Sequence, residues 1–295
     1  MNQKGMSRNC SIPTVGYAYG HASRDPRVSE GPYCIQSNTQ NTQALNWIKI
    51  IEAPKAQHQH IQALDDVVYC CTQLAETIHA IAQTQKPFLM IGGDHSCAIG
   101  TWHGAASAYH QPIGLIWIDA HLDSHTFKSS PSQNIHGMPL AALLGHGHSS
   151  LTELKHTAPV IQPEHLTLIG ATSYEPEESE LLNTLNVQVH PLSTIQHQNP
   201  TSIIQTVVDA MTQAQQPFGI SLDLDVFDPH LAPAVTTYAE LGLDISSTLT
   251  ALQYAAQSPY FIGLEIAEFT PANDLDHITE HLVMKIISHT FGVKL

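Results

Sequence analysis

Residues 113–125 read IGLIWIDAHLDSH, an almost wholly apolar run that ends in alternating aspartate and histidine side chains. Near-continuous apolar character, without the alternation of a half-exposed strand, is typical of strands buried on both faces of a parallel sheet. Similar short runs that end in polar residues recur along the chain. They predict strands at residues 87–93, 113–120, 166–171, 187–190, 218–225 and 261–268.

Longer segments with helical periodicity separate these strands. Between residues 61 and 83, for example, Leu64, Val67, Cys71 and Leu74 recur at helical spacing. The same pattern predicts helices at residues 61–83, 98–109, 201–214, 246–257 and 277–291. Strands that alternate with helices indicate βαβ units with right-handed crossovers, and so an α/β fold with one parallel sheet covered on both faces. With no repeat or long linker, residues 1–295 are expected to form a single domain.

The composition excludes several classes of protein. The chain has 295 residues, 42% of them hydrophobic, which is enough for a large core. Its 11 lysines and arginines face 26 acids, and the net charge of −15 argues against nucleic acid and anionic membranes as partners. No apolar run is long enough to span a bilayer, and the N-terminal segment MNQKGMSRNCSIPTV lacks the apolar core of a signal peptide. Five cysteines without metal-type spacing favour a reduced, cytoplasmic location.

Acidic and histidine side chains gather where the predicted strands end. Ligands of such sheets bind at the carboxyl ends of the strands, so these residues are candidates for a functional site. Asp119, His121 and Asp123 stand at positions i, i+2 and i+4, which point to one side of an extended chain. Asp223 and Asp225 repeat this spacing, and His95 follows an earlier strand.

Four buried carboxylates repel one another unless a positive charge lies between them. None of the basic side chains of the chain lies within these motifs, so a divalent cation is the simplest explanation. The candidate ligands are His95, Asp119, His121, Asp123, Asp223 and Asp225. A donor set rich in carboxylate and free of thiolate suits Mn²⁺ or a similar ion better than a structural zinc. Six ligands favour two ions that share a water molecule, which implies hydrolysis.

Each of these residues also has a structural interpretation when it is taken alone. Asp94 and His95 could form a turn in which Ser96 caps a helix. Asp223 and Asp225 could be solvated acids at a strand end, and His121 a hydrogen-bonded core histidine. Their coincidence at three strand ends favours the metal site.

Three motifs resemble those of the ureohydrolase family, which includes arginase, agmatinase and formimidoylglutamase. They are GGDHS at residues 92–96, DAHLDSH at 119–125 and SLDLDVFDP at 221–229. The similarity extends from RVSEGP at 27–32 to EIAEFTP at 265–271, and so covers nearly the whole chain. It implies a three-layer α/β/α sandwich around a central, mostly parallel sheet, and a homo-oligomer, either a trimer or a hexamer.

The resemblance also assigns roles at the metal site. It implies two Mn²⁺ ions per subunit, one held by His95, Asp119, Asp123 and Asp223, the other by Asp119, His121, Asp223 and Asp225. A metal-bridging hydroxide would attack the guanidinium or amidine carbon of a small-molecule substrate, and Asp123 would accept a hydrogen bond from it. His136 matches the family's proton-shuttle histidine. Glu268 matches the glutamate that pairs with the cationic head of the substrate.

The residues around the substrate are most similar to those of arginases. Ser132 and Asn134 match residues that hold an α-carboxylate, and Glu175 stands where arginases place an aspartate that binds the α-amino group. This pattern predicts hydrolysis of L-arginine to L-ornithine and urea. Agmatine, formiminoglutamate or another guanidino or amidine acid are alternatives within the family. A non-catalytic binding protein on the same fold is a remote alternative.

Two departures from the arginase pattern bear on the substrate. His125 stands where arginases have an asparagine that contacts the carboxylate. The segment APAVTTY, residues 232–238, replaces a loop that carries Gly-Thr-Pro in the family. Thr237 keeps the threonine, whereas Thr236 and Tyr238 stand where glycine and proline are expected. Because glycine adopts backbone conformations that threonine resists, we expect a different loop shape beside the pocket.

Overall fold

The computed structural model describes residues 11–155, 159–195, 200–239 and 241–295. In these residues eight strands form one sheet in the order β2-β1-β3-β8-β7-β4-β5-β6, and every neighbouring pair is parallel. The predicted parallel sheet is confirmed, and each of the six predicted strands is present. The first ten residues, where no export signal was expected, lie outside the described part. The strands are β1 Ile12–Tyr17, β2 Leu45–Ile51, β3 Phe88–Ile91, β4 Ile113–Ile118, β5 Ile161–Ile169, β6 Gln188–His190, β7 Phe218–Asp223 and β8 Phe261–Ala267.

Strands β1 and β2 were not predicted from the sequence. β1 reads IPTVGY, in which proline and glycine interrupt the apolar run. β2 lies at the edge of the sheet, and several of its side chains are exposed. Neither strand therefore carries the continuous apolar pattern of the central strands.

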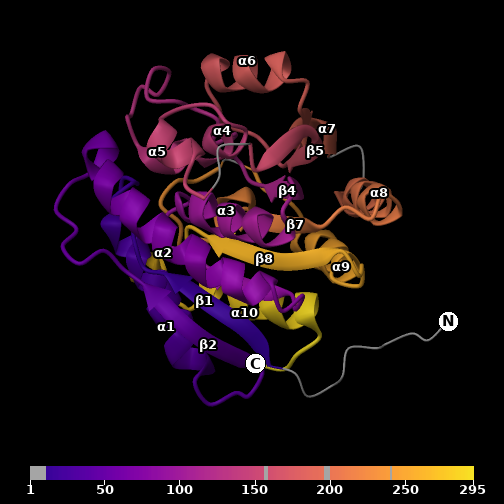
Figure 1. Cartoon of the computed structure of the whole chain (residues 1–295). Helices are drawn as coiled ribbons and strands as arrows, with labels where there is room; N and C mark the ends of the chain where they lie inside the picture. The colour runs from indigo at the N-terminus through magenta and orange to yellow at the C-terminus, as the bar shows by residue number, and fades with distance from the viewer. Residues whose placement is uncertain (1–10, 156–158, 196–199, 240) are drawn as a thin grey trace.

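The helices cover both faces of the sheet, and two separate apolar clusters fill the spaces between the layers. This arrangement is the predicted α/β/α sandwich, and Figure 1 shows α2 and α3 crossing in front of the sheet. The first layer contains α2 Leu64–Ala82, α3 Cys97–Tyr109, α4 Pro139–Leu143, α5 Ser149–Thr152 and α6 Pro176–Thr184. The second contains α1 Gly31–Thr39, α7 Leu192–Ile195, α8 Pro200–Gln213, α9 Ile245–Ala255 and α10 Ile278–Phe291. Short 3₁₀ turns complete the chain: η1 Pro26–Glu30, η2 His60–Ala63, η3 Ile135–Gly137, η4 Leu224–Val226 and η5 Pro271–Asn273.

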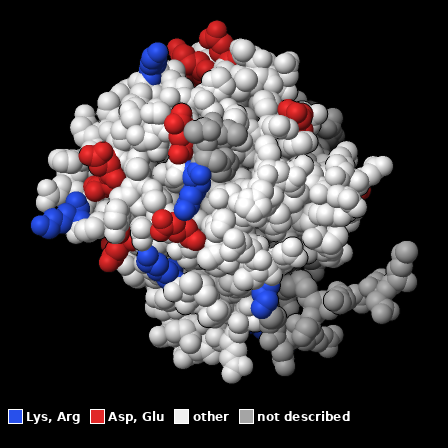
Figure 2. Space-filling model, viewed as in Figure 1, with Lys and Arg blue, Asp and Glu red and all other residues white. Residues whose placement is uncertain are grey.

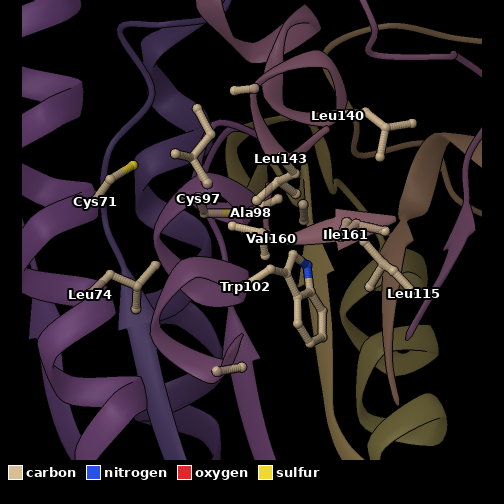
Figure 3. Packing of buried hydrophobic residues seen from close by; sticks show 14 of the residues in the cluster. Cys71, Leu74, Cys97, Ala98, Trp102, Leu115, Leu140, Leu143, Val160 and Ile161 are labelled. Atoms are coloured by element: carbon tan, nitrogen blue, oxygen red, sulfur yellow. The ribbon is translucent and has the colours of Figure 1, made fainter. Parts of the chain in front are cut away.

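Close packing holds α3 against the sheet. Trp102 of α3 is fully buried, and Figure 3 shows it beside Leu115 and Ile161. A Cβ atom on Gly219 of β7 would come within 2.1 Å of the Trp102 ring, so only glycine fits beneath it. This contact fixes α3, and with it the GGDHS turn that precedes the helix.

On the face of the molecule that Figure 2 shows, charged side chains of both signs are scattered. Among the described residues, no helix combines the length and the apolar character that a membrane crossing requires.

Candidate functional site

Four adjacent strands, β3, β8, β7 and β4, carry the acidic and histidine motifs at their carboxyl ends. A first group of candidate ligands surrounds the buried ring of His95. Its Nδ1 lies 3.2 Å from Asp119 Oδ2, 3.1 Å from Asp123 Oδ2 and 3.0 Å from Asp223 Oδ2. These residues stand at or just after the ends of three different strands, so the sheet order brings them together.

A second group surrounds His121. Its Nδ1 lies 3.0 Å from Asp225 Oδ2 and 3.5 Å from Asp119 Oδ1. Asp119 therefore presents one oxygen to each histidine. Ligand atoms lie within 4.8 Å of one another in two triads, His95–Asp119–Asp223 and Asp119–His121–Asp225, and this spacing would allow each triad to hold a metal ion.

The aspartates converge through turns, and the expected extended geometry of residues 119–123 is wrong. Strand β4 ends at Ile118, and Asp123 has a left-handed backbone with φ of 47°. Asp119 Oδ1 accepts the N–H of His121 at 2.7 Å, and Asp223 Oδ1 accepts the N–H of Asp225 at 3.0 Å. Short polar side chains that bond their own backbone two residues on favour such turns over a continued strand.

The proton arrangement around His95 tests whether a metal fits. Ser221 Oγ donates its only hydrogen to Glu265 Oε1 at 2.7 Å, so the neighbouring His95 Nε2, at 2.9 Å, must donate to Ser221. In the neutral ring His95 Nδ1 then carries the lone pair; this atom is fully buried and makes no hydrogen bond within the described chain. Although burial opposes it, the three carboxylates raise the pKa of His95, so this position attracts a positive charge, either a proton or a metal ion. Histidines that ligate metals are oriented by their second nitrogen in this way.

No other cation balances the carboxylates. Within the described residues, no lysine or arginine nitrogen lies within 4.0 Å of these four aspartates, and the basic nitrogens that do belong to His95 and His121. Burial and the neighbouring carboxylates raise the pKa of Asp223 well above its usual range, and burial raises the pKa of Asp225 to about 6. The donor set and its excess negative charge thus fit divalent cations.

A cavity of about 170 Å³ opens above the aspartates. All the predicted catalytic and substrate-binding residues line it, whereas His95 and Asp119 lie beneath its floor. The predicted residues in its wall are Asp123, His125, Ser132, Asn134, His136, Glu175, Thr237 and Glu268, and those not predicted to contact substrate include Arg24, Glu178 and Thr236.

His136 and Glu268 contact each other at the inner end of the cavity. His136 Nδ1 lies 3.1 Å from Glu268 Oε1. Although burial opposes it, the hydrogen bond and charge of Glu268 raise the pKa of His136. Glu268 also accepts the backbone N–H of His95 at 2.9 Å and the hydroxyl of Thr236 at 2.6 Å. Its carboxylate is therefore firmly oriented.

The outer end of the cavity holds a second cluster. His125 Nε2 lies 3.1 Å from Glu175 Oε2 and 3.5 Å from Glu178 Oε2. Glu175 is the N-cap residue that precedes α6, and Glu175 and Glu178 form a capping box. Asn134, another residue of the cavity wall, accepts a hydrogen bond at Oδ1 from His60 Nδ1.

Comparison with known proteins decides the family of this site and fold. The family model described as "Arginase family" matches residues 11–292. The chain belongs to the arginase family. It is 34% identical to the arginase of Bacillus caldovelox over 247 aligned residues, and the alignment covers 82% of each chain. It superimposes on the crystal structure of arginase from Bacillus subtilis with a TM-score of 0.86 and 30% identity, covering 97% of this chain and 100% of the other. Formimidoylglutamase from Bacillus subtilis, at 20% identity and a TM-score of 0.78, shares the fold over 98% of this chain and 89% of its own.

Three residues that line this arginase-family pocket, Arg24, Glu178 and Thr236, were not predicted to contact substrate, nor was His60, which bonds Asn134. Glu178 could have been found, because the Glu175 capping box places it at a predictable position. Arg24 precedes the RVSEGP segment, to which the resemblance assigned no role, and His60 lies far from all the motifs in sequence. Thr236 was noted only as a departure from the expected loop.

Proposed function

We propose that this arginase-family chain is a binuclear manganese hydrolase that converts L-arginine and water to L-ornithine and urea. The observation that carries the proposal is the position of His95 Nδ1, which lies within 3.2 Å of three carboxylate oxygens beneath a pocket lined by His136 and Glu268. The 34% identity to an arginase supports arginine as the substrate.

Two Mn²⁺ ions would be held by overlapping sets of ligands, with Asp119 and Asp223 common to both. The first set is His95, Asp119, Asp123 and Asp223, and the second is Asp119, His121, Asp223 and Asp225. Oxygen-rich ligation with two imidazoles suits Mn²⁺. When bound, divalent cations in such sites acidify water and so supply a hydrolytic nucleophile near neutral pH.

The inner residues of the pocket would bind and protonate the substrate. The Glu268 carboxylate would hold the cationic head through charge-assisted hydrogen bonds. His136, held at Nδ1 by Glu268, would pass a proton from Nε2 to the leaving amine. Asp123 would accept a hydrogen bond from the attacking group and orient it.

The outer residues favour a substrate that carries a carboxylate. His60 donates a hydrogen bond to Oδ1 of Asn134, so the amide is oriented by this contact. The Nδ2 hydrogens of Asn134 would then donate to a substrate carboxylate in the pocket. The Ser132 hydroxyl and Thr237 line the same cavity. Agmatine lacks a carboxylate, so these donors would favour arginine over it.

One observation favours a second candidate substrate. His125 already pairs with Glu175, the residue proposed to receive an α-ammonium group. A guanidino or amidine acid without a free α-ammonium would leave this pair intact.

Urea release from the Mn²⁺-loaded protein tests the proposal, with arginine, agmatine and 4-guanidinobutanoate assayed side by side. We expect urea from arginine, little from agmatine, and no activity after the metal is removed by a chelator. Urea from 4-guanidinobutanoate alone would support the second candidate. No urea from any of the three, with two ions bound per subunit, would overturn the proposed function.

A further inference from the structure

The Thr236 hydroxyl forms a hydrogen bond to Glu268, the carboxylate proposed to bind the cationic head of the substrate. Its Oγ1 donates to Glu268 Oε2 at 2.6 Å, and both residues line the cavity. Glycine is the residue expected at this position from the family resemblance, so the hydroxyl is a feature of this chain. It lies close enough to the proposed substrate position to act in recognition.

The position of Thr236 is set by its surroundings. The Ala234 N–H donates to Thr279 Oγ1 at 2.9 Å, and Ala234 O accepts the N–H of Thr270 at 2.8 Å. Ala234 and Val235 are buried. Thr236 is absent from the described residues with positive φ, so its backbone adopts an ordinary conformation. The hydroxyl is thus held at Glu268 without backbone strain.

The hydrogen bonds of Glu268 leave it little capacity for a planar cation. Its Oε1 accepts from the backbone of His95 and from His136, and its Oε2 accepts from Thr236. A carboxylate offers about four lone-pair sites, so one site on Oε2 is left. Glu268 alone therefore cannot accept two parallel N–H groups from a guanidinium.

Thr236 can supply the missing acceptor. A hydroxyl that donates its hydrogen to Glu268 keeps its own lone pairs free. Oγ1 of Thr236 and Oε2 of Glu268 then stand side by side on the cavity wall, 2.6 Å apart. Two adjacent acceptors are what a forked, planar cation requires.

We propose that Thr236 is a specificity-determining residue that accepts one N–H of the substrate's guanidinium or amidinium group while Glu268 Oε2 accepts the neighbouring one. A primary ammonium has diverging hydrogens and gains little from the second acceptor. The inference rests on the proposed function, because it takes the pocket to bind a guanidino substrate.

Two variants and one control test this role in the Mn²⁺-loaded protein. Thr236→Val keeps the shape of the side chain but lacks the hydroxyl, and Thr236→Ser retains the hydroxyl. Tyr238→Phe is the matched control, because it removes a hydroxyl of the same loop that donates to Pro233 O at 3.0 Å, away from Glu268. The measurements are KM and kcat for arginine, the inhibition constant of L-ornithine, and the Kd of methylguanidinium by calorimetry.

For Thr236→Val we expect a KM for arginine and a Kd for methylguanidinium about tenfold higher, with unchanged metal content. L-Ornithine shares the outer end of arginine and carries a primary ammonium, so its inhibition constant should change less than twofold. Thr236→Ser and Tyr238→Phe should resemble the wild type. If Thr236→Val does not fold, Thr236→Gly takes its place with the same expectation.

Two results would overturn the role of Thr236. One is wild-type affinity for methylguanidinium in Thr236→Val. The other is an equal rise in the arginine KM and the ornithine inhibition constant, which would mean that Thr236 only positions Glu268. If the wild type releases no urea from arginine, the proposed function fails, and the methylguanidinium titration still decides the role of Thr236.

Discussion

The ring of His95 stacks on the indole of Trp117, with centroids 4.2 Å apart and planes inclined by 11°. The same indole donates its Nε1 hydrogen to Asp119 Oδ2 at 2.9 Å. One residue of β4 thus orients two candidate ligands of the same ion, one through its face and one through its edge. Groups that orient metal ligands in this way influence affinity without touching the ion.

Trp117→Phe should keep an aromatic ring against His95 and lose the hydrogen bond to Asp119. We expect the affinity for Mn²⁺ to fall about tenfold or more, since loss of such a supporting group typically costs that much. Calorimetric titration of Mn²⁺ into the metal-free protein measures the change. Unchanged affinity would show that the indole hydrogen bond does not support the site.

Asp119→Ala and His136→Ala should separate metal binding from proton transfer. Asp119 faces both histidines, so its removal should abolish activity and release metal. His136→Ala should retain both ions and slow turnover by about 100-fold or more, the usual size of a proton-transfer contribution. Metal analysis and urea release are measured on the same samples. Full activity of His136→Ala at every pH would contradict the proton-shuttle role.

His60→Ala should weaken recognition of the substrate carboxylate. His60 bonds Asn134 Oδ1, and without it the amide is free to rotate. The loss of one hydrogen bond predicts a KM for arginine about fivefold higher with little change in kcat. His58→Ala, a change at an exposed residue outside the pocket, is the control. Equal effects of the two substitutions would count against a role of His60 at Asn134.

The metal-free protein should lose stability as the pH rises. Burial raises the pKa of Asp225 to about 6, so the folded state binds more protons than the unfolded state between about pH 4 and 6. Although burial opposes it, Asp225 raises the pKa of His121, whose stabilising contribution is lost as the pH rises above about 6.5. Both contributions predict a lower Tm at pH 8 than at pH 5.

Mn²⁺ should reverse this trend, because its ligands must be deprotonated to bind it. The gain in Tm on adding Mn²⁺ should therefore grow from pH 5 to pH 8. Thermal unfolding at several pH values, with and without metal, measures both effects. A Tm of the metal-free protein that rises with pH would contradict the assigned proton binding.

The sequence by itself determined the class of fold and the set of candidate metal ligands. Both depend on local patterns: the apolar runs of β4 and β7 are visible in the chain, and their acidic residues follow directly. β1 and β2 gave no such signal, because an interrupted strand and an edge strand owe their pairing to neighbours rather than to their own residues.

Only the tertiary structure decided how the site is assembled. Asp119 and His121 converge through a turn closed by the Asp119 side chain, a geometry that the spacing did not predict. His60 reaches Asn134, and Thr236 reaches Glu268, from segments 74 and 32 residues away. The physical reason is that such contacts arise from packing of the whole chain. Neither the periodicity of the sequence nor the local propensities of the contacting residues predict these contacts.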